Sequence, residues 1–253
     1  MTRDELRTYL TFYRDLGVTE LFRREPGAPV PVVPAIAIPM KGAPPPPPMP
    51  KPQITLPPLA PSDDTLLKIL NDIGPDCRRC GLCEQRSRIV FGSGNEQAKL
   101  VFVGEGPGAD EDAQGVPFIG RAGQLLTQMI ENTASKEGIA ISRPDVYICN
   151  VVKCRPPENR APQPDEMEIC GQYLFRQLMT IQPKAICALG STAAKALLAT
   201  KEGVTKLRGN WHKWHDIPVM VTYHPSYLLR PYNQDAKRQS WEDLKKVLHF
   251  VYD

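Results

Sequence analysis

The hydrophobic positions of this 253-residue chain form two alternating kinds of segment. Short apolar runs rich in β-branched residues predict buried strands, and they cover residues 99–103, 146–152, 185–189 and 219–222. Longer segments with apolar residues at helical spacing predict helices over residues 123–131, 165–181, 191–198 and 241–251. Strand and helix patterns therefore alternate from residue 99 onward.

This alternation is typical of an α/β protein with parallel strands, because parallel neighbours need a crossover connection that usually contains a helix. We expect one three-layer α/β/α sandwich with a central, mainly parallel sheet. Ligands of such sheets bind beyond the carboxyl ends of the strands. The loops that follow Val103, Asn150 and Tyr223 are therefore where a site is expected.

The first 61 residues have a different character. Apolar residues at roughly helical spacing among charges predict an amphipathic helical segment over residues 1–25. Residues 26–61 contain 15 of the 27 prolines, so they predict a disordered, extended linker. This linker is either a spacer or a tether that lets the N-terminal helix hold a protein partner. The main domain is expected over residues 62–253, with Ser62 at the start of its first helix.

Composition narrows the class of protein. The apolar content of 42% and the charged content of 23% are ordinary for a globular chain. No run approaches the roughly 18 consecutive apolar residues of a spanning helix, so no membrane partner is expected. The net charge of +3 is too small to indicate a nucleic-acid partner by itself, and any such function must be argued from local sites. We also expect a monomer.

The cysteines carry the strongest chemical signal. Five of the seven gather in two groups, namely Cys77, Cys80 and Cys83, and Cys154 and Cys170. The odd count and an N-terminus without a secretory signal predict a cytoplasmic protein, in which clustered cysteines are metal ligands or reactive thiols rather than a disulfide framework. Such thiolates hold iron–sulfur clusters or zinc, and spacing alone does not choose the four ligands. Cys149 and Cys187 fall inside strand patterns and are interpreted as buried apolar residues.

The loop over residues 104–126 combines glycines, acidic residues and Phe118. Arg121 and Ala122 stand where a phosphate-binding P-loop needs lysine and serine or threonine, so a nucleoside triphosphate is excluded. The composition favours an uncharged planar ligand that stacks on Phe118, with a water polarised by a carboxylate. The alternative is an acidic surface turn with Phe118 in the core.

A second segment, residues 147–166, places Asn150 at the end of a strand. A buried amide presents one acceptor and two donors in a plane, which matches the pairing edge of uracil and mismatches that of cytosine. Lys153, Arg155 and Arg160 follow in a proline-stiffened loop and are predicted to contact DNA phosphates. Alternatively, the asparagine is a structural cap.

A third segment, residues 222–233, places His224 after an apolar strand and before a proline. A held imidazole can donate a hydrogen bond to an oxygen on which negative charge develops. Three residues that follow it, Tyr227, Leu228 and Leu229, are predicted to form an exposed wedge for a base stack, with Arg230 as a phosphate clamp behind it. The alternative is a structural histidine.

Together these segments resemble the family 4 uracil-DNA glycosylases, the iron–sulfur branch of the uracil-DNA glycosylase superfamily. The resemblance extends from Asp76 to Leu248. It rests on four motifs in order: CxxC at 77 and 80, GEGPGADED with PFIGRAGQLL, NVVKCRPPENRAPQPDE, and HPSYLLR. It implies that the protein flips uracil out of DNA and hydrolyses its N-glycosidic bond, which leaves an abasic site for base excision repair.

The resemblance also implies the roles of individual residues. A [4Fe–4S] cluster is expected on Cys77, Cys80, Cys154 and Cys170, with Cys83 as a bystander. Phe118 is expected to stack on the flipped uracil, Asn150 to read its pairing edge and His224 to support charge on its O2 atom. Glu105 and Glu111 match acidic positions that share water positioning and thymine exclusion, in a division left open.

Gly106 of the substrate pocket departs from the pattern of the better-known branch, which has an aspartate there. Water activation is therefore expected from another group, or it matters less because the departing uracil anion is stabilised. One alternative is an interaction protein that works through its proline-rich segment, and two others stay open. One is a relative of this family that traps DNA covalently through a histidine in the basic loop, although residues 154–166 contain no histidine. The other is a non-catalytic nucleic-acid-binding module with zinc.

Overall fold

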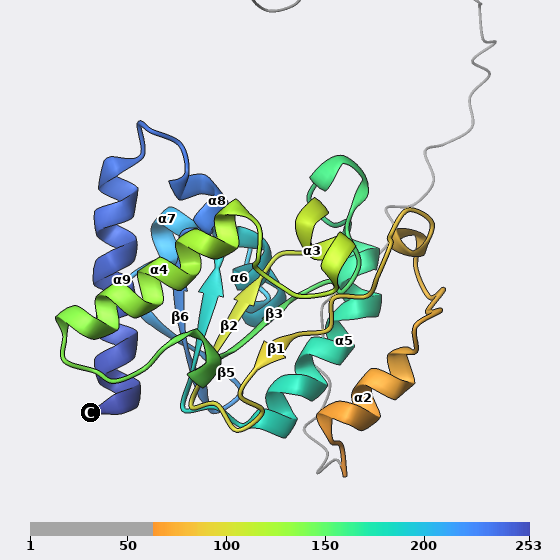
Figure 1. Ribbon diagram of the computed structural model, residues 1–253, viewed down its shortest axis with the longest axis horizontal. Coiled ribbons are helices and arrows are strands. Elements are labelled where there is room, and N and C mark those ends of the chain that lie inside the picture. Colours follow the sequence, from red (N-terminus) through yellow and green to blue (C-terminus); the bar gives the residue numbers. More distant parts are fainter. Residues whose placement is uncertain (1–62) are drawn as a thin grey trace, which may run out of the picture. The chain divides into compact units, whose positions relative to one another are not determined.

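A computed structural model describes residues 63–253 as a mixed α/β domain (Figure 1). The predicted N-terminal helical segment, the proline-rich linker and Ser62 lie outside the described residues. The described part contains a six-stranded sheet in the order β1-β3-β2-β4-β6-β5. Its strands are β1 (Ser93–Gly94), β2 (Leu100–Gly104), β3 (Tyr147–Asn150), β4 (Ala185–Leu189), β5 (Trp211–Trp214) and β6 (Ile217–Thr222).

The four central strands are parallel, as the alternating pattern predicted. β2 pairs with β3 on one side and with β4 on the other, and β4 pairs with β6. β1 and β5 are antiparallel edge strands that the sequence analysis missed. β1 has only two residues, and β5 is largely polar or exposed, so neither shows the apolar run of a buried strand.

The four predicted helices are confirmed within α4 (Arg121–Lys136), α5 (Pro164–Ile181), α6 (Gly190–Leu198) and α9 (Gln234–Tyr252). α9 begins seven residues earlier than its apolar pattern suggested. Short helices that were not predicted are α3 (Ala109–Gln114), α7 (Val204–Leu207) and α8 (Pro225–Leu228), with 3-10 turns η1 (Gly81–Cys83), η2 (Arg143–Asp145) and η3 (Pro157–Asn159).

The first described helix, α2 (Leu66–Ile73), corrects the expected start at Ser62. Thr65 is its N-cap, and the Thr65 side chain accepts a 3.1 Å hydrogen bond from the Lys68 N–H. A hydroxyl satisfies the unpaired N–H groups only of residues two or three positions further on. Ser62 is therefore one helical turn too early for this helix.

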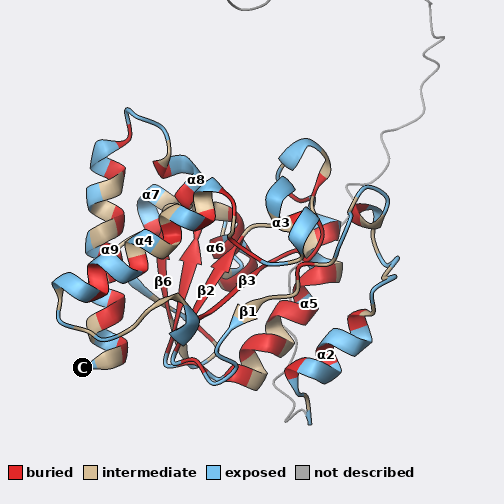
Figure 2. Cartoon of the chain, in the orientation of Figure 1, coloured by how far each residue is buried: buried red, intermediate tan, exposed pale blue. Residues whose placement is uncertain are grey.

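The strands of the sheet and the helix sides that pack on it are buried (Figure 2), and their apolar residues form two clusters, which makes the three-layer sandwich. Alternate residues of β2 divide between the layers: Val101 and Val103 pack with α2, α5 and α6, whereas Leu100 and Phe102 pack with α4 and α9. No helix in residues 63–253 is long and apolar enough to cross a membrane. Because the central strands are parallel, the ends at Gly104, Asn150, Leu189 and Thr222 meet at one edge of the sheet.

Candidate active site and cysteine cluster

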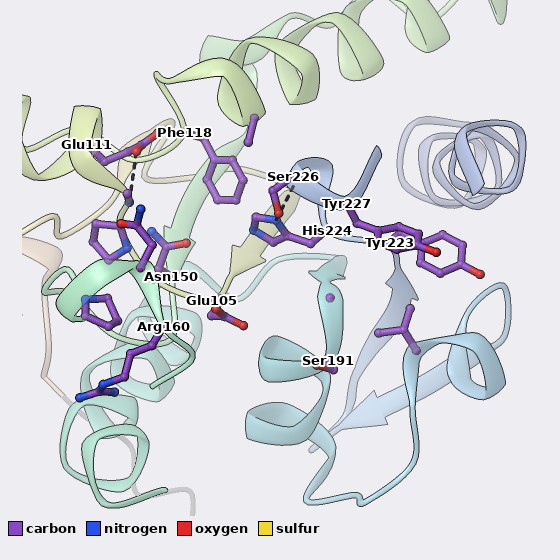
Figure 3. Close-up of a pocket in the computed structure, with 18 of the residues that line it drawn as sticks. Glu105, Glu111, Phe118, Asn150, Arg160, Ser191, Tyr223, His224, Ser226 and Tyr227 are labelled. Carbon is purple, nitrogen blue, oxygen red and sulfur yellow. Dashed lines mark hydrogen bonds between the residues drawn. The ribbon is translucent and has the colours of Figure 1, made fainter. Parts of the chain in front are cut away.

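A cavity of about 570 Å³ lies at this carboxyl edge (Figure 3). It is lined by all six residues expected to recognise or act on the base, namely Glu105, Gly106, Glu111, Phe118, Asn150 and His224. These residues come from the ends of β2, β3 and β6, from α3, and from the loop between α3 and α4. The fold therefore brings together segments that are more than 100 positions apart in the sequence.

Asn150 ends β3 directly opposite Gly104 of β2. Its side chain is only 1% exposed, and its Oδ1 atom has no hydrogen-bond partner among the described residues. A Cβ atom on Gly104 would lie 2.4 Å from Oδ1 and 2.6 Å from the Phe118 ring, so only glycine leaves room for both side chains. A buried polar atom without a partner is costly, and this one borders a cavity where a ligand could supply the missing donor.

His224 follows β6 and forms the N-cap of α8. Its Nδ1 atom accepts a 3.2 Å hydrogen bond from the Ser226 N–H and lies 2.8 Å from the Ser226 hydroxyl. Burial lowers the pKa of His224 from 6.5 to about 4, although the Glu111 carboxylate opposes this change. The imidazole is therefore neutral near pH 7, with its proton on Nε2, and can act as a hydrogen-bond donor there.

The ring of Phe118 lies 5.5 Å from the His224 ring between centroids, tilted by 39°. Both rings and the Asn150 amide face one region of the cavity in Figure 3. The Phe118 backbone has a φ of +53°, a left-handed conformation that is uncommon for an aromatic residue. Such a conformation persists where neighbouring groups hold it, and strained residues of this kind are concentrated at functional sites.

The two glutamates have different surroundings. The Glu111 carboxylate accepts hydrogen bonds from the backbone N–H groups of Gly108 (3.1 Å), Ile119 (3.0 Å) and Gly120 (2.9 Å). It therefore ties the start of α3 to the loop that carries Phe118. Glu105 accepts a hydrogen bond from the Thr192 hydroxyl, and the described residues supply no other donor to its carboxylate. Glu105 is the carboxylate with remaining capacity to accept a bond from water.

Gly106 borders the cavity where its chain packs against the basic loop. A Cβ atom there would lie 2.8 Å from Cγ2 of Val152 and 3.5 Å from Cδ of Pro156. A side chain at this position would require Val152 to move, whereas the distance to Pro156 is an ordinary van der Waals contact. The structure thus gives a steric reason for the glycine.

The wedge predicted after His224 needs one correction. Leu228 is 1% exposed because it lies on the inner face of α8, so it cannot enter a base stack. Tyr227 is 41% exposed, Leu229 is half-buried and Arg230 is exposed. The Tyr227 ring stacks on Tyr223 at 5.3 Å, and the Arg230 guanidinium lies 5.8 Å from the Tyr227 ring centroid. The accessible tip therefore consists of Tyr227, Leu229 and Arg230.

The predicted phosphate contact of Lys153 is wrong. Its side chain is 1% exposed, and its Nζ atom donates hydrogen bonds to the Asn150 carbonyl (2.8 Å) and to Oε1 of Gln177 (2.5 Å). The loop turns back after β3, which directs this side chain inward. A basic residue in a loop can contact DNA only when its side chain points to the surface, and the sequence alone does not give that direction.

The other two basic residues of this loop are accessible. Arg155 is half-buried and donates from Nε to Oδ1 of Asn159 over 2.8 Å. Arg160 forms a two-bond pair with the Glu166 carboxylate at 2.7 and 2.8 Å, and Figure 3 shows its guanidinium directed away from Phe118 and His224. This pair fixes the basic loop to the first turn of α5.

The predicted cluster cysteines lie near one another, with Cys77 and Cys80 before β1, Cys154 at the start of the basic loop and Cys170 in α5. Cys154 and Cys170 are buried, and Cys77 and Cys80 are half-buried beside the same core. Burial raises the pKa of the Cys154 thiol to about 12 and that of Cys170 to about 11, and the charge of Cys80 acts in the same direction on both. The four cysteines are thus close enough to influence one another electrostatically.

Polar groups are directed at two of the sulfur atoms. The Lys153 N–H donates to Cys170 Sγ over 3.3 Å, and Arg86 Nη1 donates to Cys154 Sγ over 3.6 Å and to the Cys77 carbonyl over 2.7 Å. Within residues 63–253, no three His, Cys, Asp or Glu side chains are arranged to hold a metal ion. Four cysteine thiolates are the ligand set that would hold an iron–sulfur cluster. The donor set fits such a cluster in number, softness and hydrogen bonding.

Several site residues were not found from the sequence. Ser226 orients His224, Thr192 binds Glu105, and Asp112, which is 3% exposed, accepts hydrogen bonds from the N–H groups of Ser87 and Arg88. Asp112 thereby joins α3 to the segment that follows the first cysteines. The Ser226 contact is a local N-cap between residues two positions apart, so a helix-start pattern could have indicated it. No spacing rule relates the other partners, since those contacts join segments that only the tertiary fold brings together.

Comparison with known proteins agrees with this geometry. A model described as the uracil DNA glycosylase superfamily matches residues 91–245. The chain is 44% identical to a type-4 uracil-DNA glycosylase of Thermotoga maritima over 190 residues, which cover 74% of this chain and 96% of the relative. It is 42% identical to that of Sulfurisphaera tokodaii over 192 residues (73% and 84%) and 40% identical to that of Archaeoglobus fulgidus over 193 residues (73% and 90%).

Proposed function

Because the chain belongs to the uracil-DNA glycosylase superfamily, we propose that it excises uracil from DNA by hydrolysing the N-glycosidic bond of a flipped nucleotide. The product is an abasic site for base excision repair. The observation that carries this proposal is the buried Asn150 amide, whose Oδ1 atom lacks a donor at the wall of the cavity. A uracil N3–H group is a donor of the required kind.

Base selection is assigned to Asn150 and Phe118. The amide accepts from N3–H and donates to O4 of uracil, whereas cytosine presents an unprotonated N3 and an amino group there. A mismatched base leaves the buried amide unpaired, which is the costly outcome for a polar site. Phe118 supplies the stacking face, which attracts any planar base and therefore adds affinity rather than selection.

Leaving-group stabilisation is assigned to His224. As the glycosidic bond breaks, negative charge develops on the uracil ring, and the neutral Nε2–H group is positioned to donate toward O2. The Ser226 N–H group holds Nδ1 as an acceptor and so keeps the proton on Nε2. One such donor contributes roughly 3–4 kcal/mol to transition-state stabilisation at comparable sites.

Water positioning is assigned to Glu105. Glu111 is already committed to three backbone N–H groups, whereas Glu105 accepts one bond from Thr192. The role demands only modest activation, since the sugar carries positive charge once the base departs. No lysine is among the described residues that line the cavity, which supports a monofunctional enzyme without a Schiff-base step.

DNA is expected to lie across the cavity mouth. Tyr227 and Leu229 would press into the space left by the flipped base, and Arg230, Arg155 and Arg160 would contact phosphates. Arg160 must keep or exchange its pair with Glu166 when it does so. We exclude Lys153 and Leu228 from the DNA contact because both are buried.

We further propose that Cys77, Cys80, Cys154 and Cys170 hold a [4Fe–4S] cluster. When bound, such a cluster supplies a covalent cross-link between the first cysteine segment and the basic loop. The residues of the chain have separate tasks there: Arg86 joins the Cys77 carbonyl to Cys154, and the Lys153 N–H orients Cys170. Cys83 stays outside the ligand set. Zinc on the same cysteines is the alternative.

Substitution of single cysteines tests this assignment. Cys77→Ser should lose bound iron and the broad visible absorption of the cluster, and Cys83→Ser, its matched control three residues beyond Cys80, should keep both. A colourless protein with stoichiometric zinc, prepared without air, would exclude the iron–sulfur cluster. Equal iron loss in both variants would show that Cys83 is a ligand.

The central experiment measures uracil release directly. An oligonucleotide with one uracil is incubated with the protein in chelator and then treated with alkali, beside a thymine control. We expect alkali-dependent cleavage for uracil alone. Asn150→Ala should relax or abolish uracil selection, and His224→Ala should slow cleavage about 10²- to 10³-fold with little change in DNA affinity. Failure of the unaltered protein to liberate uracil would refute the proposed function.

Further proposals concern the setting of the reaction and the alternative of covalent trapping. A denaturant-resistant protein–DNA adduct would favour covalent trapping over turnover, although the basic loop contains no histidine to form it. We place the reaction in the cytoplasm and in a monomer, and we expect the proline-rich segment, as a spacer or as a tether for a protein partner, to stay outside the chemistry. Deleting residues 1–61 should therefore leave excision from a bare oligonucleotide unchanged.

A further inference from the structure

We propose that Arg143 is a positioning residue that holds Phe118 in its base-stacking conformation. This inference rests on the proposed function, because it concerns the residue that stacks on the target base. Arg143 lies in η2, the turn that precedes β3, and it is outside the motifs that indicated the site. Its role follows from the contacts that surround the Phe118 backbone.

Phe118 needs external support, because its φ of +53° is unfavourable for a residue with a side chain. On its C-terminal side, the Ile119 and Gly120 N–H groups donate to the Glu111 carboxylate. On its N-terminal side, Arg143 Nη2 donates to the Pro117 carbonyl over 2.6 Å. The peptide groups that flank Phe118 are thus held by one anionic and one cationic side chain.

The second half of the Arg143 guanidinium connects this loop to α4. Nη1 donates to the Thr127 hydroxyl over 2.9 Å, and that hydroxyl donates to the Gly123 carbonyl over 3.1 Å. Gly123 in turn is so close to Phe118 that an added Cβ atom would lie 1.9 Å from its carbonyl carbon and oxygen. The contacts therefore close a ring that runs from Pro117 through Arg143, Thr127 and Gly123 to Phe118.

The chemistry of Arg143 suits this task. Its side chain forms no ion pair within residues 63–253, and both guanidinium bonds go to uncharged oxygen atoms of the ring. A planar guanidinium can bond two acceptors at fixed directions, whereas an ammonium group acts as a point charge. Because Arg143 is half-buried and its guanidinium bonds only uncharged oxygen atoms, we infer that it maintains the geometry of the loop rather than a surface charge.

The experiment measures product binding as well as turnover. Wild type, Arg143→Met, Arg143→Lys and Thr127→Val are compared for inhibition by free uracil, for single-turnover excision and for affinity to uncleaved DNA. Lys184→Met is the matched control. Lys184 directly precedes β4, at the edge of the sheet opposite the cavity, and its ammonium group donates a 2.9 Å hydrogen bond to the Val251 carbonyl. The variant removes that bond. Thermal unfolding is recorded for every variant.

We expect Arg143→Met to raise the uracil inhibition constant about tenfold, because stacking on a misplaced Phe118 is lost. Its single-turnover rate should fall while affinity for uncleaved DNA stays within about twofold. Arg143→Lys should lie between wild type and Arg143→Met, and Thr127→Val should shift the inhibition constant in the same direction. Lys184→Met should lower stability alone.

Wild-type uracil inhibition in a folded Arg143→Met protein would overturn the inference. If Arg143→Met does not fold, Thr127→Val decides instead, and an unchanged inhibition constant in that variant counts against the ring. These results differ from a failure of the proposed function, in which the wild-type protein itself would neither release uracil nor be inhibited by it.

Discussion

The Nζ atom of Lys153 donates a 2.8 Å hydrogen bond to the backbone carbonyl of Asn150, three residues earlier in the chain. The backbone N–H of the same lysine donates to Cys170 Sγ. One residue therefore contacts both the proposed base-reading asparagine and a proposed cluster ligand. This relationship links the two halves of the site through the turn that follows β3.

Replacing this lysine should affect folding rather than DNA binding. Lys153→Met leaves the Asn150 carbonyl and the Gln177 side chain without their buried partner, which should reduce the free energy of unfolding by about 1–3 kcal/mol. Denaturant unfolding and DNA titration measure the two effects separately. Arg155→Met is the matched control in the same loop, and it should weaken DNA binding and leave stability nearly unchanged. The opposite pattern in the two variants would show that Lys153 reaches DNA after all.

Substitutions of the two neighbouring leucines after His224 should likewise have different effects, one on stability and the other on excision. Leu228→Ala should cost about 2–5 kcal/mol of stability because it leaves a cavity under α8. Leu229→Ala should preserve stability and slow excision from duplex DNA more than from single strands, since only a duplex must be opened. Calorimetry and paired excision assays provide the measurements. Equal destabilisation by both variants would contradict the buried position of Leu228.

The excision rate should not depend on an ionisation near pH 6.5. His224 has a pKa of about 4 in the folded protein, so the neutral donor is present throughout the range above pH 5. The unfolded chain binds a proton at higher pH than the folded one, and His224 therefore reduces stability as pH falls from 6.5 toward 4. A pH–rate profile on single-stranded substrate tests this expectation. An inflection at pH 6–7 that disappears in His224→Asn would refute the neutral donor.

A surface network should confer the opposite pH dependence on stability. His249 lies 2.9 Å from Glu137 and 2.7 Å from Asp253, and its hydrogen bonds to them raise its pKa above 6.5. A raised folded pKa stabilises the fold below pH 6.5, and this contribution is lost as pH rises through the folded value. Thermal midpoints measured from pH 6 to 9 should therefore fall slightly, and His249→Gln should remove that slope. An unchanged slope in the variant would mean that other groups produce it.

Local sequence patterns determined the central architecture of this protein. The apolar runs at 99–103, 146–152, 185–189 and 219–222 correspond to the four parallel strands, because a strand covered on both faces needs continuous apolar residues. The topology of such a sheet then places the ends of these strands at one edge. Phe118, Asn150 and His224 could be predicted as cavity residues for this reason, and they line the cavity.

Only the tertiary structure decided which way individual side chains point and which distant groups meet. Lys153 and Leu228 belong to segments with the composition of a binding loop, yet the side chain of each is directed inward, that of Lys153 toward Asn150 and Gln177 and that of Leu228 from the inner face of α8. The support of Phe118 by Glu111 and Arg143 also joins residues without a common period or spacing. Periodicity describes one element at a time, whereas these contacts depend on how several elements pack together.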